Sequence, residues 1–266
     1  MTITLEICVD SLESATNAVE GGADRLEICA NLGIGGGTTP SVGLVNALRG
    51  HFPHTPLMAM VRPRVGDFVY TDGEMEAMLD DIRAFKQAGA AGVVFGILDE
   101  RGCVDVERTK RLVDEALPMQ VCFHRAFDMT LDPFEAYDAL SRISGITRIL
   151  TSGHGRIVPD SFPVLRDLFM RSRAPDCPLI LPGSGINADT IDAVLSALLP
   201  FGLREVHLSG GRWMPGRTAH RIEGMGMGAG DGHDWDVWRT TAGTVRAIRR
   251  ALDETAQDVP VNRSST

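Results

Sequence analysis

Short runs rich in apolar and β-branched residues alternate with longer amphipathic segments along most of the chain. Eight runs predict β-strands: Ile3–Val9, Asp24–Cys29, Pro56–Arg62, Gly92–Leu98, Met119–His124, Thr147–Thr151, Leu179–Leu181 and Glu205–Ser209. Their starts are separated by about 21 to 36 residues, which is the room that one strand, one helix and two loops require. The pattern therefore predicts eight consecutive strand–helix units.

Several segments between these runs carry helix signals. Asp10 with Glu13 resembles a capping pair at the start of the first helix. The segment Glu74–Gln87 places five large apolar residues on one helical face. Asn187 is expected to cap a helix that runs to position 197, and a last helix is expected over Thr241–Thr255.

Eight units in one uninterrupted series predict an α/β fold, a single-domain (β/α)8 TIM barrel over residues 1–258, with a frayed tail over 259–266. A doubly wound open sheet is the alternative. The sequence Leu5–Cys8 recurs unchanged at Leu26–Cys29, which favours closure because two neighbouring strands then present the same side chains. The stretch 223–236 is interpreted as a long loop after the last strand and a candidate lid.

Side chains alternate between the two faces of a strand, so each predicted strand has one apolar set and one more polar set. The apolar set should meet the surrounding helices, which turns the polar set into the barrel. Unpaired charges there would cost several kcal/mol each, so they must pair with one another, with water or with a ligand. An ion-pair network inside the core is the alternative to a functional site. The side chains expected inside are Glu6, Cys8, Arg25, Glu27, Cys29, Met58, Met60, Arg62, Arg64, Cys122, His124, Glu205, His207 and Ser209.

Polar and glycine-rich positions also gather at the carboxyl ends of the predicted strands, the face where barrel enzymes keep their active sites. Glycine-rich loops there commonly bind phosphate or another anion through backbone N–H groups, although plain turn geometry is the alternative. The candidates for anion binding are Ser152, Gly183, Ser184, Gly185, Ser209 and Gly210.

Composition narrows the class of protein. The 266 residues include 26 Lys and Arg against 35 Asp and Glu, a formal charge of −9 that argues against a nucleic-acid partner. No apolar run reaches the roughly 18 residues of a membrane helix, and no secretory signal is visible at the start. Five cysteines without a Cys-x-x-Cys pair indicate reduced thiols. We therefore expect a cytoplasmic protein.

Cys8 and Cys29 follow the two glutamates by two positions and share the predicted inward face. Two thiolates suit Cu(I), a soft cation tolerant of low coordination, better than a hard cation. The alternative is that both are small hydrophobic core residues. No organic cofactor is implied.

Several motifs together resemble the CutC family, whose proteins are named for copper homeostasis. The similar segments, in family order, are Leu5–Cys8, Gly22–Cys29, Gly36–Ser41, Arg62–Arg64 with Gly66–Phe68 and Tyr70, Phe123–Asp128, Thr151–Gly153 and Glu205–His207. The resemblance implies a (β/α)8 barrel, a cytoplasmic location, a homo-oligomer (a dimer) and Cu(I) binding at Cys8 and Cys29. The sequence departs from the family at Ser184, where glycine or alanine is usual, and along 223–236.

Two functions follow from these observations. In the first, the protein is a copper homeostasis factor that holds Cu(I) on a barrel scaffold. In the second, it is an enzyme of unassigned reaction that acts on a small anionic or polyhydroxylated molecule. Arg62 and Arg64 would then hold the substrate's charge. His124 or His207 would act as acid or base, oriented by a carboxylate. The catalytic candidates are Glu6, Glu27, Arg62, Arg64, His124, Arg125, Asp128, Glu205 and His207.

Overall fold

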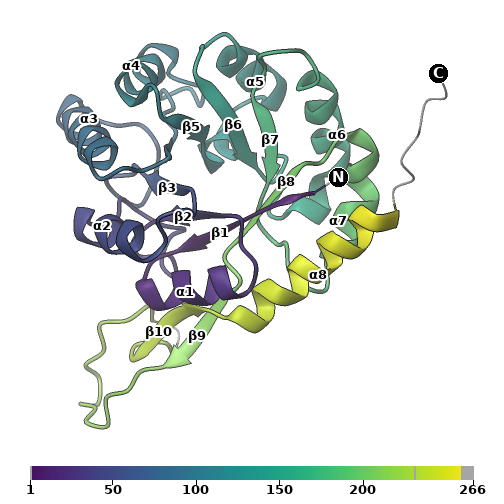
Figure 1. Cartoon of the computed structure of the whole chain (residues 1–266). Helices are drawn as coiled ribbons and strands as arrows, with labels where there is room; N and C mark the ends of the chain where they lie inside the picture. Colours follow the sequence, from purple (N-terminus) through teal and green to yellow (C-terminus); the bar gives the residue numbers. More distant parts are fainter. Residues whose placement is uncertain (1, 231, 259–266) are drawn as a thin grey trace.

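Strand and helix alternate throughout the computed structural model, which describes residues 2–230 and 232–258 (Figure 1). Within these residues eight parallel strands form one sheet: β1 Thr4–Val9, β2 Arg25–Ile28, β3 Leu57–Met60, β4 Gly92–Phe95, β5 Gln120–Phe123, β6 Ile146–Thr151, β7 Leu179–Pro182 and β8 Glu205–Leu208. The order β7-β6-β5-β4-β3-β2-β1-β8 pairs sequence neighbours, and a bridge between Gly183 and His207 joins the two ends. The predicted TIM barrel is confirmed.

Helices surround the barrel in the described part of the chain. The α-helices are α1 Leu12–Glu20, α2 Val42–His51, α3 Asp72–Gln87, α4 Val106–Ala116, α5 Pro133–Ser141, α6 Phe162–Arg171, α7 Ile191–Leu198 and α8 Ala242–Asp258. Three short 3-10 helices follow strands or helices: η1 Arg125–Met129, η2 Val158–Ser161 and η3 Leu199–Phe201. None of the described helices is both long enough and apolar enough to span a bilayer.

The helix starts correct two details of the sequence interpretation. Helix α1 is capped by Ser11, whose hydroxyl accepts the N–H three residues on, whereas the Asp10 carboxylate accepts an N–H from the loop after β2. Helix α7 begins after Thr190, because Asn187 uses its side-chain oxygen in a turn of its own. Helix α3 has a full capping box, with Thr71 as its N-cap.

The predicted alternation of side chains between the two faces of a strand is found in the barrel wall. Leu5, Ile7 and Val9 of β1 are buried with the apolar faces of the helices, while Glu6 and Cys8 face the interior side. The interior itself is divided. An apolar cluster from β3 to β7 consists of Met58, Val94, Cys122, Leu150 and Leu181. Ionic side chains from β1, β2, β6 and β8 and a smaller sulfur-containing cluster also lie inside, and they set up the chemistry of the barrel.

An antiparallel hairpin follows β8 and extends from the barrel beside α1 (Figure 1). It consists of β9 Gly211–Pro215 and β10 Asp236–Thr240. Trp213 and Trp238 pack edge to face across it, with ring centroids 5.4 Å apart. The expected loop over 223–236 forms the tip, except that its last residue already belongs to β10. The expected frayed tail over 259–266 lies outside the described residues.

Candidate functional site

A cavity of about 570 Å³ lies at the carboxyl ends of the strands. Ten of the residues singled out from the sequence line it: Cys8, Glu27, Arg62, His124, Arg125, Asp128, Ser184, Gly185, His207 and Ser209. They come from the strands β1, β2 and β8 and from the segments that follow β3, β5, β7 and β8, so the fold brings together groups that are far apart in the sequence. The volume is ordinary for a small-molecule site.

The two thiols meet at one wall of this cavity, where Cys8 lines the cavity and Cys29 does not. The Sγ atoms of Cys8 and Cys29 are 3.5 Å apart, and Met60 belongs to the same buried cluster. The hydrogen bond with Cys29, burial and the nearby Glu27 carboxylate raise the pKa of the Cys8 thiol well above its usual value. Both thiols are therefore protonated at neutral pH. Sequence reasoning did not count Met60 as a site residue, because a methionine in a strand carries no signal beyond that of a core residue.

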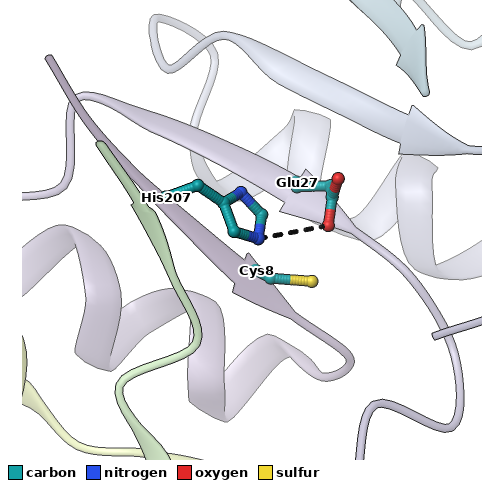
Figure 2. Close-up of side chains that lie close together, drawn as sticks. All are labelled: Cys8, Glu27 and His207. Carbon is teal, nitrogen blue, oxygen red and sulfur yellow. Dashed lines mark ion pairs between the residues drawn. The ribbon is translucent and has the colours of Figure 1, made fainter. Parts of the chain in front are cut away.

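Cys8 also belongs to a second cluster, with Glu27 and His207 (Figure 2). One donor atom from each residue lies within 4.8 Å of the other two. The His207 Nε2 is 3.8 Å from the Glu27 Oε2, which the dashed line marks. Burial raises the pKa of Glu27, with a smaller contribution from Glu6, although His207 partly offsets it. The Glu27 Oε1 is buried without a hydrogen-bond partner among the described residues.

An ionic network lies beside this cluster inside the barrel. Arg25 pairs with Glu6 and, at 2.7 Å, with Glu205, which also accepts from Arg148 at 2.8 Å. The His207 Nδ1 is 2.7 Å from the Glu6 Oε1. Burial opposes ionisation of Glu6, but Arg25 and His207 outweigh it and lower its pKa to about 2.

For part of the expected site, the structure fits the alternative of an ion-pair network inside the core. Glu6 and Glu205 form ion pairs with internal arginines, and neither residue lines the cavity. Arg25 and Arg148 complete those pairs, and sequence reasoning did not count them as site residues. The contact with Glu6 also holds the His207 ring in place. Burial would lower the pKa of His207, but Glu27 and Glu6 raise it.

His124 is buried where β5 ends. Its Nδ1 accepts the backbone N–H of Ala126 at 3.2 Å, and its ring centroid is 4.9 Å from that of Phe68. Burial and the nearby Arg62 guanidinium lower its pKa to about 3, so the imidazole is neutral at pH 7. Because Nδ1 is the acceptor, the single ring proton is assigned to Nε2. That N–H has no partner among the described residues.

The two arginines of the Arg-Pro-Arg motif diverge. Arg62 is 8% exposed, lines the cavity and donates to the carbonyl oxygens of Gly35 and Gly37. The expectation that Arg64 faces the interior is wrong. Its guanidinium pairs with Glu74 at 2.6 Å outside the cavity, because β3 ends at Met60 and Arg64 lies in the loop that follows it.

Asp128 holds the loop after β6. It accepts the backbone N–H groups of Ser152 and His154, and it pairs with Arg125 at 2.7 Å. Ser152 is fully buried, and its hydroxyl contacts Asp128 and Gly155. Asp128 and Arg125 still line the cavity, whereas Ser152 lies behind it. The main contacts of this group are structural.

The glycine-rich loops differ from one another. Ser184 and Gly185 line the cavity with positive φ angles of 91° and 70°. Gly183 is needed for packing, since a Cβ there would lie 2.6 Å from Leu150 and 3.2 Å from His207. Ser209 lines the cavity, but Gly210 packs toward Val245 and the hairpin side. Anion binding by these loops stays a prediction.

Comparison with known proteins identifies close relatives in sequence. The CutC family model matches residues 3–212. A CutC family protein of Salmonella paratyphi B is 40% identical over 225 residues, covering 85% of this chain and 87% of that protein. A CutC family protein of Citrobacter koseri is 40% identical over 223 residues, covering 84% of this chain and 86% of that protein.

Solved structures agree on the fold. A Streptococcus agalactiae protein named as a copper homeostasis protein CutC superposes with a TM-score of 0.71 at 27% identity, covering 78% of this chain and 98% of that chain. A phosphoenolpyruvate phosphomutase from Streptomyces platensis superposes with a TM-score of 0.55 at 16% identity, covering 79% of this chain and 77% of that chain. The second likeness concerns the barrel alone.

Proposed function

This chain belongs to the CutC family, and on that premise we propose that it is a cytoplasmic copper homeostasis protein that binds Cu(I) through Cys8 and Cys29. The name of the Streptococcus agalactiae structure supports the copper role by relationship. The observation that carries the proposal is the pair of buried Sγ atoms 3.5 Å apart, of which the Cys8 residue lines the cavity.

The thiol pair fits a soft cation. With metal–sulfur bonds of about 2.3 Å, sulfurs 3.5 Å apart subtend an angle of about 100° at the metal. That angle leaves room for a third donor, and Met60 is buried in the same cluster as the two cysteines. Thiolate and thioether sulfur favour Cu(I) over hard cations. Binding must displace the thiol protons, so the site is one that a metal deprotonates rather than one that is preformed as thiolates.

A second donor set shares Cys8 but not Cys29. The trio Cys8, Glu27 and His207 offers sulfur, oxygen and nitrogen, a combination that suits Zn²⁺. The two sets are distinguished by the need for Cys29. Under our proposal the second thiol is required, and the preferred ion is Cu(I).

The test is a competition titration of the fully reduced protein with Cu(I) against a chromophoric chelator, repeated with Zn²⁺. We expect one tightly bound Cu(I), lost in Cys8→Ser and in Cys29→Ser and kept in Cys103→Ser, whose half-exposed thiol lies outside the cavity. Retention of Cu(I) in Cys29→Ser, or tighter binding of Zn²⁺ than Cu(I) by the wild type, would contradict the proposal.

The cytoplasmic location is part of the proposal and has a physical reason. Two thiols in contact must stay reduced to bind Cu(I), and a reducing compartment keeps them so. The expected homodimer stays a prediction, which light scattering of the purified protein checks. For the enzyme alternative, no reaction is proposed.

A further inference from the structure

Arg62 is a buried cation that lacks a carboxylate partner. Within the described residues no carboxylate oxygen lies within 4.0 Å of its guanidinium, and its Nε has no hydrogen-bond partner. Its Nη1 donates to the carbonyl oxygens of Gly35 and Gly37 at 2.6 and 2.9 Å, which satisfies hydrogen bonds but leaves the charge uncompensated. A buried charge without a counter-charge is costly. The cavity that Arg62 lines is where an anion would relieve that cost.

A neutral donor lies beside this cation. His124 is 5% exposed, lines the same cavity and carries an unpartnered Nε2–H. Both side chains contact the Phe68 ring: the Arg62 Cζ is 5.1 Å from its centroid, and the His124 ring centroid is 4.9 Å from it. The Arg62 guanidinium also lowers the pKa of His124, so the two groups lie near each other in one cavity. Together they offer a pair of donors for the oxygens of one anionic group.

An unpartnered oxygen completes the set. Glu27 is 1% exposed and lines the cavity, and its Oε1 has no partner among the described residues. A hydroxyl group is the ligand function that suits it, since a hydroxyl both donates and accepts hydrogen bonds.

We propose that the cavity binds a small hydroxylated oxyanion, a hydroxycarboxylate or a phosphate monoester, with the anionic group on Arg62 and His124 and a hydroxyl on Glu27. The Phe68 ring also lines the cavity, and the unpartnered atoms of Arg62, His124 and Glu27 are buried. Binding of the ligand therefore requires side chains at the cavity wall to move. The site goes beyond copper binding, because neither the Cys8 nor the Cys29 sulfur takes part in it.

The test uses a matched three-carbon series: glycerol, D-glycerate and glycerol 3-phosphate. Each is added to the metal-free, reduced, full-length protein at about 10 mM, and binding is measured by calorimetry and by the shift in melting temperature. We expect D-glycerate, glycerol 3-phosphate or both to bind, and glycerol not to bind. Binding of glycerate alone identifies a carboxylate site, and binding of the phosphate alone identifies a phosphate site. Failure of both anions, or equal binding of glycerol, overturns the proposal.

Two variants locate the anion. His124→Phe removes the Nε2–H and fills the space beside Phe68, and Arg62→Lys keeps the charge but loses the fork of donors. Each substitution should weaken binding of the anion by about tenfold, as expected for loss of a charge-assisted or buried hydrogen bond. His54→Phe, the same exchange at an exposed position, should bind like the wild type.

Unchanged anion affinity in Arg62→Lys overturns the proposal even if His124→Phe does not fold. The Cys29→Ser variant separates the two sites, because Cys29 does not line the cavity. It should keep binding the anion while losing Cu(I), so failure of the copper proposal leaves the anion result intact.

Discussion

Replacing His124 by phenylalanine should make the protein less sensitive to acid. His124 has its pKa lowered from 6.5 to about 3 by burial and by Arg62, so the folded state stays neutral at this position where the unfolded chain binds a proton. Below pH 6.5 protonation therefore favours the unfolded state, and stability falls as the pH falls toward 3.

The magnitude follows from the two pKa values. Between pH 7 and pH 5 the unfolded chain gains about 0.7 of a proton at this histidine and the folded protein gains almost none, which removes about 2 kcal/mol of stability. Continued to below pH 3, the loss approaches about 5 kcal/mol. The other titrating groups contribute equally to wild type and variant, so they cancel in the comparison.

The assay is urea unfolding of wild type and His124→Phe at pH 7 and pH 5. The loss of unfolding free energy between the two pH values should be about 2 kcal/mol larger in the wild type. A cost of the substitution itself is the same at both pH values, so it does not enter the difference. If the two proteins lose equal free energy within the error of linear extrapolation, the assignment of a neutral buried His124 is refuted. An NMR titration gives an independent check, because the His124 ring signals should not move between pH 7 and pH 4.5.

Three further outcomes are expected. Arg25→Met removes the cation that two buried carboxylates share, which leaves Glu205 with Arg148 alone and Glu6 with His207 alone. It should cost about 3–5 kcal/mol in urea unfolding at pH 7, and a loss below about 1 kcal/mol would contradict the ionic network. Thr71→Ala removes the cap of α3 and should cost about 1 kcal/mol, and an unchanged stability would show that the capping box is not formed in solution. Gly96→Ala places a Cβ 2.6 Å from the His124 Nδ1, so it should lower the melting temperature and shift the His124 ring resonances; a spectrum like that of the wild type would argue against this contact.

Much of the barrel was predictable because its information is local. Hydrophobic alternation along β1, β2 and β8 assigned Glu6, Glu27 and His207 to the interior, and the structure places them there. The same pattern brought Cys8 and Cys29 to one face, and parallel pairing of β1 with β2 then brings their sulfurs into contact.

The errors arose where the backbone leaves regular structure. Alternation stops at Pro63, so the direction of Arg64 could not be carried over from the strand before it. Likewise, both Asp10 and Ser11 are residue types that can cap a helix. Ser11 is the cap because the Asp10 carboxylate already accepts a backbone N–H from the loop after β2.

The sequence by itself determined the series of strands and helices and the face on which each strand side chain lies. It also determined that each of two neighbouring strands carries a carboxylate and a thiol on the same face. Those properties depend on residues a few positions apart. Only the tertiary structure decided that Arg148 of β6 neutralises Glu205 of β8, that Arg62 keeps its charge uncompensated, and that His124 is neutral. Each depends on which groups from distant segments closure of the barrel brings within a few ångströms. The energy of a buried charge is set by those neighbours and by exclusion of water, and a linear sequence contains neither.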